Sequence, residues 1–285
     1  MNKLYTGSDI TILMSVYKNS KAKEVESAVN SVLDEQSIKV KRAIIVLDGS
    51  INKELEDTLD ELSSRYHNTI QLIRLKNNVG LATALTEGLQ YVDTRLVARM
   101  DSDDIAIYSR FETQLEMFNN IKNLGIAGGA IDEFTTEGMY SDGVVRKMPL
   151  SDKSIREFAK FRNPFNHPTV MFLKKTVDSV GGYQKFGYLE DYYLWLRILS
   201  STTSNISCNT DKVLVHMRGG ERMYSRRGNL KYLQKVIQLK RWMLENKMIN
   251  IFEFLVGSVI NTMVTLMPTK LRSIFYSVFL RSKNE

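Results

Sequence analysis

The chain has 285 residues, of which 43% are hydrophobic and 25% are charged. These values are ordinary for a globular protein and exclude a disordered, collagen-like or low-complexity chain. A single cysteine, Cys208, excludes an internal disulfide framework and a cysteine-based zinc site. The first nine residues are polar and lack the pattern of a secretory signal, so we expect a cytoplasmic protein.

The net charge of +7 is concentrated near the C-terminus. Residues 226–285 hold eleven Lys and Arg residues against three acidic ones, which leaves residues 1–225 close to neutral. A uniformly basic nucleic-acid-binding protein would distribute its charge differently, and we expect no nucleic-acid partner.

Hydrophobic patterns in the first 119 residues alternate between strand and helix. Their spacing predicts strands at 10–17, 43–47, 70–75 and 96–100, and helices at 21–34, 55–66, 81–91 and 109–119. Four successive strand–helix units predict an α/β fold with a mainly parallel, helix-covered sheet.

The pattern after residue 119 is less regular. Strands are predicted at 126–134, 170–172 and 213–215, and helices at 151–161 and 190–199. From residue 232 to the end the pattern is helical throughout, with a break at Pro268. We therefore divide the chain into a main domain, 1–225, and a basic amphipathic helical tail, 226–285.

Polar residues follow each of the four predicted strands of the first half. In an open parallel sheet the carboxyl ends of the strands meet at one edge, where ligands bind. Any one of these residues alone is typical of a turn, because turns favour Asp, Asn and Gly. Together they predict a binding site, and they are Tyr17 and Asn19, Asp48, Asn78 and Gly80, and Asp101 to Asp104.

The most specific of these groups is the acidic cluster Asp101-Ser102-Asp103-Asp104. Carboxylates two residues apart can share a divalent cation, and hard oxygen ligands suit Mg²⁺ or Mn²⁺ with positions left for phosphate oxygens. The alternative is a helix N-cap, which Asp104 would suit well. No Walker loop and no G-x-G-x-x-G follows the first strand, which argues against a kinase, an NTPase or a dinucleotide oxidoreductase.

Taken in order, these motifs resemble glycosyltransferase family 2, which has the GT-A fold. The resemblance covers roughly residues 9–245 and points to the branch that builds bacterial capsule, O-antigen and exopolysaccharide repeats, amylovoran-type enzymes among them. The matching segments are SVYKN (15–19), SVLDEQ (31–36), IVLDGS (45–50), NVGLA (78–82), ARMDSDD (98–104), NPFNHPTVMF (163–172), GGY (181–183) and LEDY (189–192).

The resemblance implies a nucleotide-sugar-binding half at 1–119 and an acceptor and catalytic-base half at 120–225. Asp101 and Asp103 match the family's DXD motif, which would hold the ribose, a Mn²⁺ or Mg²⁺ ion and the diphosphate. Asp48 would face the uracil, although Leu47 stands where the family often has a second acid. The residues expected to bind the donor nucleotide are Val16, Tyr17, Asp48, Asn78, Asp101, Ser102 and Asp103.

Asp191 matches the family's catalytic base. A carboxylate that accepts the proton of a sugar hydroxyl as the new bond forms can contribute about 10²–10⁴-fold, and one base without an enzyme nucleophile predicts inversion of the anomeric centre. The alternative is an ordinary acidic first turn of a helix. Further candidates for acceptor or diphosphate contacts are Glu190, His167, Arg218 and Arg222, and His216 is a candidate third metal ligand. For the two histidines a structural role, and for the arginines a solvated basic loop, are the alternatives.

The tail contains two apolar stretches, 254–269 and 274–280, flanked by Lys and Arg. The first is short for a membrane span of about 20 residues. Apolar helix faces with basic flanks suit the headgroup region, so we expect a peripheral protein on the inner face of the cell membrane. The alternatives are a cap packed on the catalytic domain and a homodimer interface.

We therefore predict an inverting, metal-dependent glycosyltransferase of surface polysaccharide synthesis. Its donor would be a nucleotide sugar, a UDP-hexose or UDP-N-acetylhexosamine, and its acceptor a lipid-pyrophosphate-linked saccharide. A sugar nucleotidyltransferase is one alternative. Such an enzyme would have a glycine-rich segment with Arg and Lys after the first strand, and this sequence has none there. A non-catalytic saccharide-binding or scaffold subunit is another, against which the intact Asp101, Asp103 and Asp191 argue.

Overall fold

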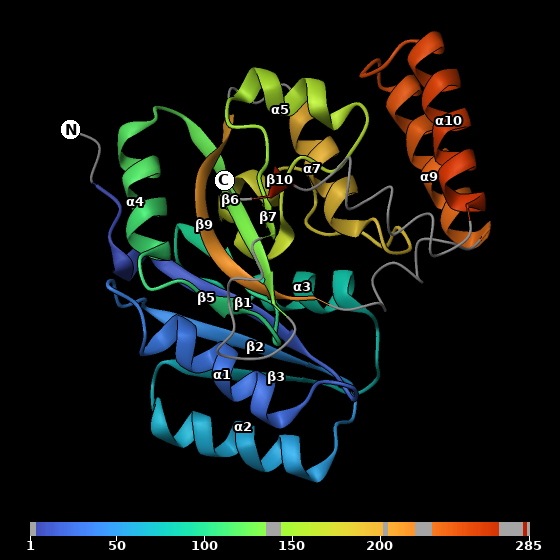
Figure 1. The fold of residues 1–285 in the computed structure, drawn as a ribbon. Coiled ribbons are helices and arrows are strands. Elements are labelled where there is room, and N and C mark those ends of the chain that lie inside the picture. Colours follow the sequence, from blue (N-terminus) through green and yellow to red (C-terminus); the bar gives the residue numbers. More distant parts are fainter. Residues whose placement is uncertain (1–3, 135–143, 202–204, 220–229, 268–281, 284–285) are drawn as a thin grey trace.

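The computed structural model describes residues 4–134, 144–201, 205–219, 230–267 and 282–283. Its centre is a ten-stranded mixed sheet with helices packed on it (Figure 1). The strand order is β10-β7-β6-β8-β4-β1-β2-β3, and β9 pairs with both β5 and β6. The predicted α/β fold is confirmed.

The first half alternates strand and helix as predicted. Its elements are β1 (Ile10–Val16), α1 (Ala22–Leu33), β2 (Arg42–Asp48), α2 (Lys53–Arg65), β3 (Ile70–Leu75), α3 (Leu81–Leu89), β4 (Leu96–Arg99), β5 (Ile105–Ala106) and α4 (Arg110–Asn120). Strands β4, β1, β2 and β3 are parallel, so their carboxyl ends lie at one edge of the sheet.

The second half joins the same sheet through antiparallel strands, with β8 beside β4 and β6 beside β8. Its elements are β6 (Leu124–Phe134), β7 (Val144–Arg146), α5 (Asp152–Ala159), β8 (Met171–Leu173), α6 (Lys174–Asp178), α7 (Glu190–Ser200), β9 (Ile206–Arg218), α9 (Leu230–Glu245), α10 (Ile251–Leu266) and β10 (Ser282–Lys283). Short 3₁₀ turns occur at Gly7–Asp9 and His167–Thr169.

Two sequence predictions need correction here. The strand expected at 213–215 is part of a 13-residue strand, β9, which pairs along most of β6. The prediction of helix to the very end is wrong, because β10 pairs antiparallel with β7. Residues 268–281, with the second apolar stretch, lie outside the described residues, as does the boundary placed at 225.

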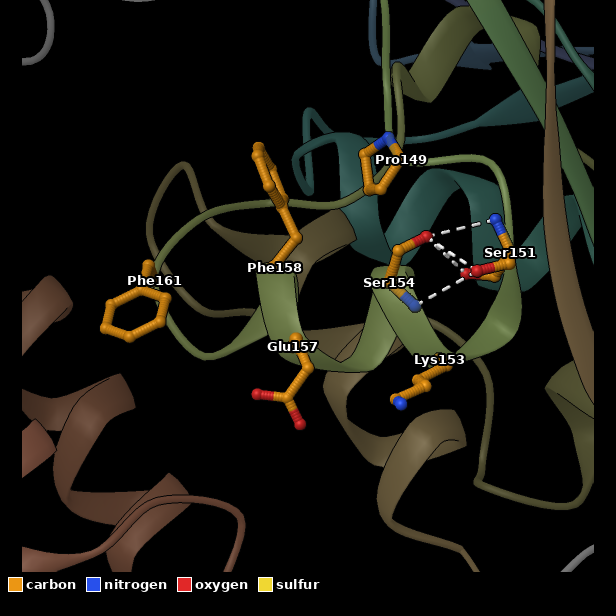
Figure 2. A pocket seen from close by; sticks show the side chains of 7 residues that line it. All are labelled: Pro149, Ser151, Lys153, Ser154, Glu157, Phe158 and Phe161. Atoms are coloured by element: carbon orange, nitrogen blue, oxygen red, sulfur yellow. Dashed lines mark hydrogen bonds between the residues drawn. The ribbon is translucent and has the colours of Figure 1, made fainter.

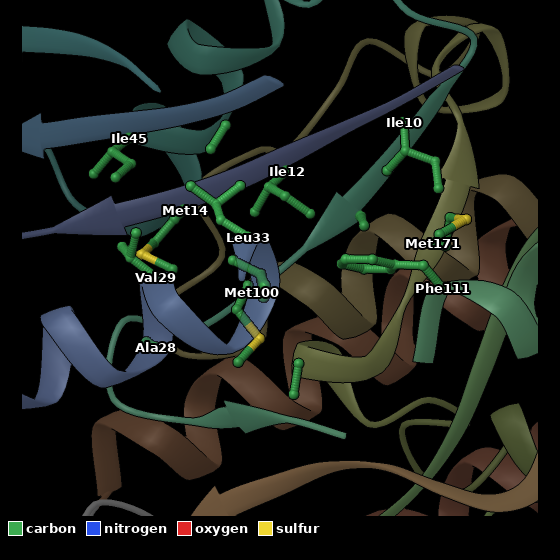
Figure 3. Close-up of a cluster of buried hydrophobic side chains, with 14 of the residues drawn as sticks. Ile10, Ile12, Met14, Ala28, Val29, Leu33, Ile45, Met100, Phe111 and Met171 are labelled. Carbon is green, nitrogen blue, oxygen red and sulfur yellow. The ribbon is translucent and has the colours of Figure 1, made fainter. Parts of the chain in front are cut away.

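The alternation of side chains along β1 divides the core into two clusters. Ile12 and Met14 face one side of the sheet, where they join Val29 and Leu33 of α1 (Figure 3). Leu13 faces the other side, where the cluster includes side chains from α3, α5, α7 and α9. Because side chains on a strand alternate between faces, a strand buried on both sides reads as a continuous apolar run.

Helix α9 is part of this core rather than a separate tail. Val236, Leu239 and Met243 are buried in the second cluster, and α10 packs against α9 at the outer edge of the molecule (Figure 1). This agrees with the cap alternative for α9. In the described part of the chain, the helices are too short or too polar to pass through a bilayer.

Asp48, the last residue of β2, holds the turn that leads into α3. Its carboxylate accepts hydrogen bonds from the backbone N–H groups of Val79 (2.6 Å) and Gly80 (2.9 Å) and from Nδ2 of Asn78 (3.1 Å). The next residue, Gly49, has φ +84°, and a Cβ there would lie 2.6 Å from the backbone nitrogen of Asn78. Asp48 and Gly49 thus allow the ends of β2 and β3 to meet closely.

We expect Asp48→Ala to lower the free energy of unfolding by about 2–4 kcal/mol, because two backbone N–H groups and one amide lose a charged acceptor away from water. Chemical denaturation followed by circular dichroism measures this. The matched control is Asp57→Ala, which removes an exposed ion pair with Lys53 and should cost about 0.5 kcal/mol or less. Equal stability of the two variants would contradict a structural role for Asp48.

Candidate active site

The residues predicted to bind a nucleotide lie along the carboxyl edge of the parallel strands. Val16 is the buried last residue of β1, and Tyr17 directly after it is 39% exposed, with its backbone N–H donating to Oγ of Ser20 (3.1 Å). Asp48 ends β2 and is 4% exposed. Asn78, which follows β3, donates both to the Asp48 carboxylate and to its carbonyl oxygen (3.0 Å).

The acidic cluster directly follows β4 and is held by two arginines. Nη2 of Arg99 contacts Oδ1 of Asp101, and Arg99 itself is only 2% exposed. Arg218, at the end of β9, donates its backbone N–H to Oδ1 of Asp104 (2.8 Å) and its Nε to the carbonyl oxygen of Asp103 (3.1 Å). The predicted contact residue Arg218 therefore reaches the cluster, whereas Arg222 lies outside the described residues.

The protonation equilibria of the cluster reflect its crowding. Loss of hydration, together with the carboxylates of Asp101 and Glu24, raises the pKa of Asp103 to about 6. Asp103 is an exposed residue, so solvent screens part of this effect. Burial, Asp101 and Asp103 raise the pKa of Asp104 well above its usual value.

One carboxylate oxygen of the cluster, Oδ2 of Asp104, is buried without a hydrogen-bond partner. An orphaned carboxylate oxygen beside two further carboxylates fits a divalent cation, because hard oxygen ligands suit Mg²⁺ and Mn²⁺. In the described ranges, no three His, Cys, Asp or Glu side chains are grouped so that they would bind a metal ion. The assignment of Asp101 and Asp103 as metal ligands therefore stays a prediction from the DXD motif.

The predicted third ligand, His216, is brought beside the cluster by sheet pairing. It lies opposite Ile105 in the antiparallel pair of β9 and β5. Its Nδ1 lies 2.6 Å from Oδ1 of Asp132. Such a carboxylate partner fixes the orientation of an imidazole ring, as it does for many metal-binding histidines.

Asp191 lies in the first turn of α7 and has a partner that the sequence motifs did not assign. Nδ2 of Asn163 donates to Oδ2 of Asp191 (2.6 Å), while Oδ1 of Asn163 accepts from the backbone N–H of Phe165 (3.2 Å). The second bond fixes which end of the amide faces Asp191. Glu190, the preceding residue, is directed into a more buried environment, and burial raises its pKa.

Two buried side chains of the matching motifs, His167 and Tyr183, pair with each other. Nε2 of His167 lies 3.0 Å from the hydroxyl of Tyr183, which is 4% exposed. Burial raises the pKa of Tyr183 above its usual range; Arg99 lowers it, and the carboxylates of Asp191 and Asp101 raise it further. Neither Tyr183 nor Arg99 was singled out as a functional candidate, although both stand inside the matching motifs.

His167 has a structural environment. Burial and the Arg99 guanidinium lower its pKa well below the usual value, so the ring is neutral near pH 7. Its ring also packs edge-on against Trp195, with centroids 6.1 Å apart. These contacts favour the structural alternative for His167 over a charged contact to phosphate.

A separate apolar cleft of about 570 Å³ lies on α5, away from the acidic cluster. Figure 2 shows its lining, in which Pro149, Phe158 and Phe161 supply the apolar surface. None of the predicted site residues lines this α5 cleft.

Comparison with known proteins shows the family. Residues 11–181 match the model of glycosyl transferase family 2. The chain is 34% identical over 268 residues to the amylovoran biosynthesis glycosyltransferase AmsE of Erwinia amylovora, covering 93% of this chain and 97% of that protein. It is 32% identical over 274 residues to the UDP-Gal:alpha-D-GlcNAc-diphosphoundecaprenol beta-1,3-galactosyltransferase of Escherichia coli, covering 95% and 96%.

Solved structures share the fold at low sequence identity. The mannosyltransferase PcManGT from Pyrobaculum calidifontis, in complex with GDP-Man and Mn²⁺, matches with a TM-score of 0.60 at 13% identity, over 96% of this chain and 81% of that one. S. aureus TarS 1–349 in complex with UDP-GlcNAc matches with a TM-score of 0.54 at 16% identity, over 84% and 72%. As its motifs predicted, the chain belongs to glycosyltransferase family 2.

Proposed function

We propose that this glycosyltransferase transfers a sugar, with inversion, from a UDP-sugar to a lipid-pyrophosphate-linked saccharide in bacterial surface polysaccharide synthesis. The observation that carries the proposal is that a chain of glycosyltransferase family 2 has carboxylates both after β4, at Asp101 and Asp103, and at the start of α7, where Asn163 holds Asp191. The chain thus has a group suited to hold the donor and a group suited to activate the acceptor. The E. coli relative, whose name specifies a diphosphoundecaprenol acceptor, supports the class of acceptor.

On the donor side, Asp101 and Asp103 would hold Mn²⁺ or Mg²⁺ together with the diphosphate. The unpartnered oxygen of Asp104 and the raised pKa of Asp103 support a cation there. When bound, the ion supplies stabilisation of the charge that develops on the leaving diphosphate. Arg218 stands beside the cluster, where its guanidinium can pair with phosphate oxygens. His216 remains the candidate for a third ligand, and Val16, Tyr17 and Asn78 for contacts to the nucleoside.

On the acceptor side, Asp191 acts as the general base. The acceptor oxygen forms the new glycosidic bond as the bond from the anomeric carbon to the diphosphate breaks, and the hydroxyl proton passes to Asp191. Asn163 orients the carboxylate and stabilises its charged form through one hydrogen bond. Direct attack from the opposite side of the sugar inverts the anomeric centre.

The proposed location is the inner face of the cell membrane, where a lipid-linked acceptor would be available. The basic C-terminal segment and the apolar stretch at 254–269 support peripheral attachment there. A sugar nucleotidyltransferase would form a nucleotide sugar instead of consuming it, and a scaffold subunit would bind saccharide without releasing UDP. Release of UDP that depends on the acceptor distinguishes the proposal from both.

We expect Asp191→Asn to lower kcat by about 10²–10⁴-fold, because the amide keeps the size of the side chain but cannot accept a proton. The affinity for UDP should stay within a few-fold, since the donor site is untouched. Coupled UDP release and calorimetric titration measure the two quantities. Asp178→Asn, at an exposed acid of α6, is the matched control. From an α-linked UDP-hexose the product should be β-linked, and an α-linked product would contradict direct displacement.

We expect Asn163→Ala to lower kcat and to shift the acidic limb of its pH profile to higher pH. A hydrogen bond to a carboxylate favours its charged form, so losing it raises the pKa of the base and protonates Asp191 at a higher pH. The control is Asn205→Ala, which removes a comparable amide hydrogen bond, to Thr176, that does not involve the Asp191 carboxylate. A variant that is less stable but has an unchanged pH profile would mean that Asn163 has no effect on the base.

We expect metal-dependent UDP binding to weaken as the pH falls from about 7.5 to 5.5. The pKa of Asp103 is raised to about 6, so protons compete with the cation for this carboxylate below that pH. Titration calorimetry with Mn²⁺ measures the affinity. Asp103→Asn should bind UDP weakly at both pH values, and EDTA should reproduce that loss in the unmodified protein. Full activity in EDTA would show that the metal assignment is wrong.

A further inference from the structure

Helix α10 differs from an ordinary surface helix in the direction of its apolar side chains. Ordinary surface helices turn their apolar side chains toward the core and their polar ones outward. In α10 the buried residues are Gly257 and Thr265, and Phe254 packs against the second core cluster, while most of the large apolar side chains are exposed by 37–72%. The exposed set, called here the α10 apolar face, is Ile251, Phe252, Leu255, Val256, Val259, Ile260, Met263 and Leu266.

The contacts of the opposite face fix this orientation. A Cβ at Gly257 would lie 2.5 Å from Nζ of Lys240, a buried residue of α9, so the Lys240 side chain packs directly on Gly257. Glu253 accepts hydrogen bonds at the start of α10 and pairs with Lys160, at the end of α5 (3.3 Å). Rolling α10 to bury its apolar face would break these contacts and expose Lys240. The outward position of the apolar side chains is therefore built in.

The charges of the helix and turn next to α10 are predominantly positive. Helix α10 itself carries one charged residue, Glu253, which is turned toward Lys160. On α9 and in the turn after it, Lys231 and Lys247 are exposed, Lys235 lies over the ring of Phe186, and Arg241 pairs with Glu245. Two copies of this surface placed face to face would bring like charges together, whereas an anionic lipid surface would attract them.

The apolar surface extends to the end of α5. Phe161 is 51% exposed and follows Lys160, the residue that pairs with Glu253. Figure 2 shows its ring beyond the end of α5, at the rim of the α5 cleft. A flat apolar surface with basic surroundings is the pattern of a helix that lies in a headgroup region.

We propose that the α10 apolar face is a membrane-docking surface, which inserts parallel to the bilayer plane into a leaflet rich in anionic lipid. The helix is about 24 Å long at 1.5 Å per residue, shorter than the hydrocarbon core, so it lies in the interface and does not cross it. The proposal rests on the proposed function only for its purpose, which is to reach a lipid-linked acceptor. Docking itself requires no catalysis.

The first test is flotation of the full-length protein with vesicles of phosphatidylcholine alone or mixed with phosphatidylglycerol. Binding should be stronger to the mixed vesicles and should fall only in part at high salt, since apolar insertion is not screened. Phe252→Ser with Val259→Ser should weaken the salt-resistant binding by about tenfold or more. The matched control is Leu4→Ser with Tyr91→Ser, because these residues are 65% and 46% exposed against 72% and 53% for the α10 pair.

The second test places an environment-sensitive dye on the α10 apolar face. Because Cys208 is the single cysteine, Cys208→Ser with Val259→Cys gives one labelling site, and Cys208→Ser with Glu61→Cys gives an exposed control on α2. Mixed vesicles should shift the emission of the dye at position 259 to the blue and leave that at 61 unchanged. An unshifted dye at 259 on vesicle-bound protein would overturn the proposal.

Three further outcomes are decisive. A dimer in lipid-free solution that dissociates in the α10 variant would assign the face to a second copy and overturn the proposal. Vesicle binding that appears only after residues 268–285 are removed would show that the protein's own C-terminal segment covers the α10 apolar face. That result would also overturn the proposal. Docking through α10 without transfer to any acceptor would support the docking surface and refute the proposed function. The α10 variant should still transfer to a short soluble acceptor.

Discussion

The crowding of three carboxylates after β4 is the constraint on which the site depends. Asp101, Asp103 and Asp104 stand within four residues, and burial together with the neighbouring carboxylates raises the pKa of Asp103 and of Asp104. The fold counters them with Arg99, a buried cation that needs a partner of opposite charge to be tolerated, and with the end of β9. The remaining excess of negative charge is what makes the edge suitable for a cation and a diphosphate. Strand order, sheet pairing and the position of Arg218 all follow from gathering these groups.

Much of the fold could be predicted because local pattern and global structure agree in its first half. Strands buried on both faces, such as β2, are continuous apolar runs, and the helices between them have clear apolar stripes. The short strands β5, β7 and β10 have too few residues to show a hydrophobic pattern. They are defined by their pairing with neighbouring strands, which the sequence does not reveal. Strand β9 was underestimated because Asp211 and Lys212 interrupt its apolar run at an irregularity of the strand, and pairing with β6 resumes at Val213.

The site was predictable at its carboxylates and not at the groups that position them. Asp101, Asp103 and Asp191 stand out because their residue types and local spacing carry the chemistry. Asn163 acts across 28 residues of sequence, and only the folded chain brings it to Asp191. For Asp48, the sequence allowed either a nucleotide contact or an ordinary role in a turn. In the structure its carboxylate accepts hydrogen bonds from the turn before α3. Composition likewise identified an apolar stretch at the tail, but not that its large side chains face away from the protein.

The packing of the last helices connects the base with the proposed membrane surface. Tyr193 of α7 and Trp242 of α9 pack edge to face, with ring centroids 5.2 Å apart. Helix α10 in turn packs against α9. Asp191, at the start of α7, is therefore separated from the α10 apolar face by one layer of helix. Helix α9 is anchored in the second core cluster, so α10 is held in a fixed place relative to α7. If the α10 apolar face docks on a bilayer as proposed, the orientation of α7, and of Asp191 in its first turn, is fixed relative to the lipid surface.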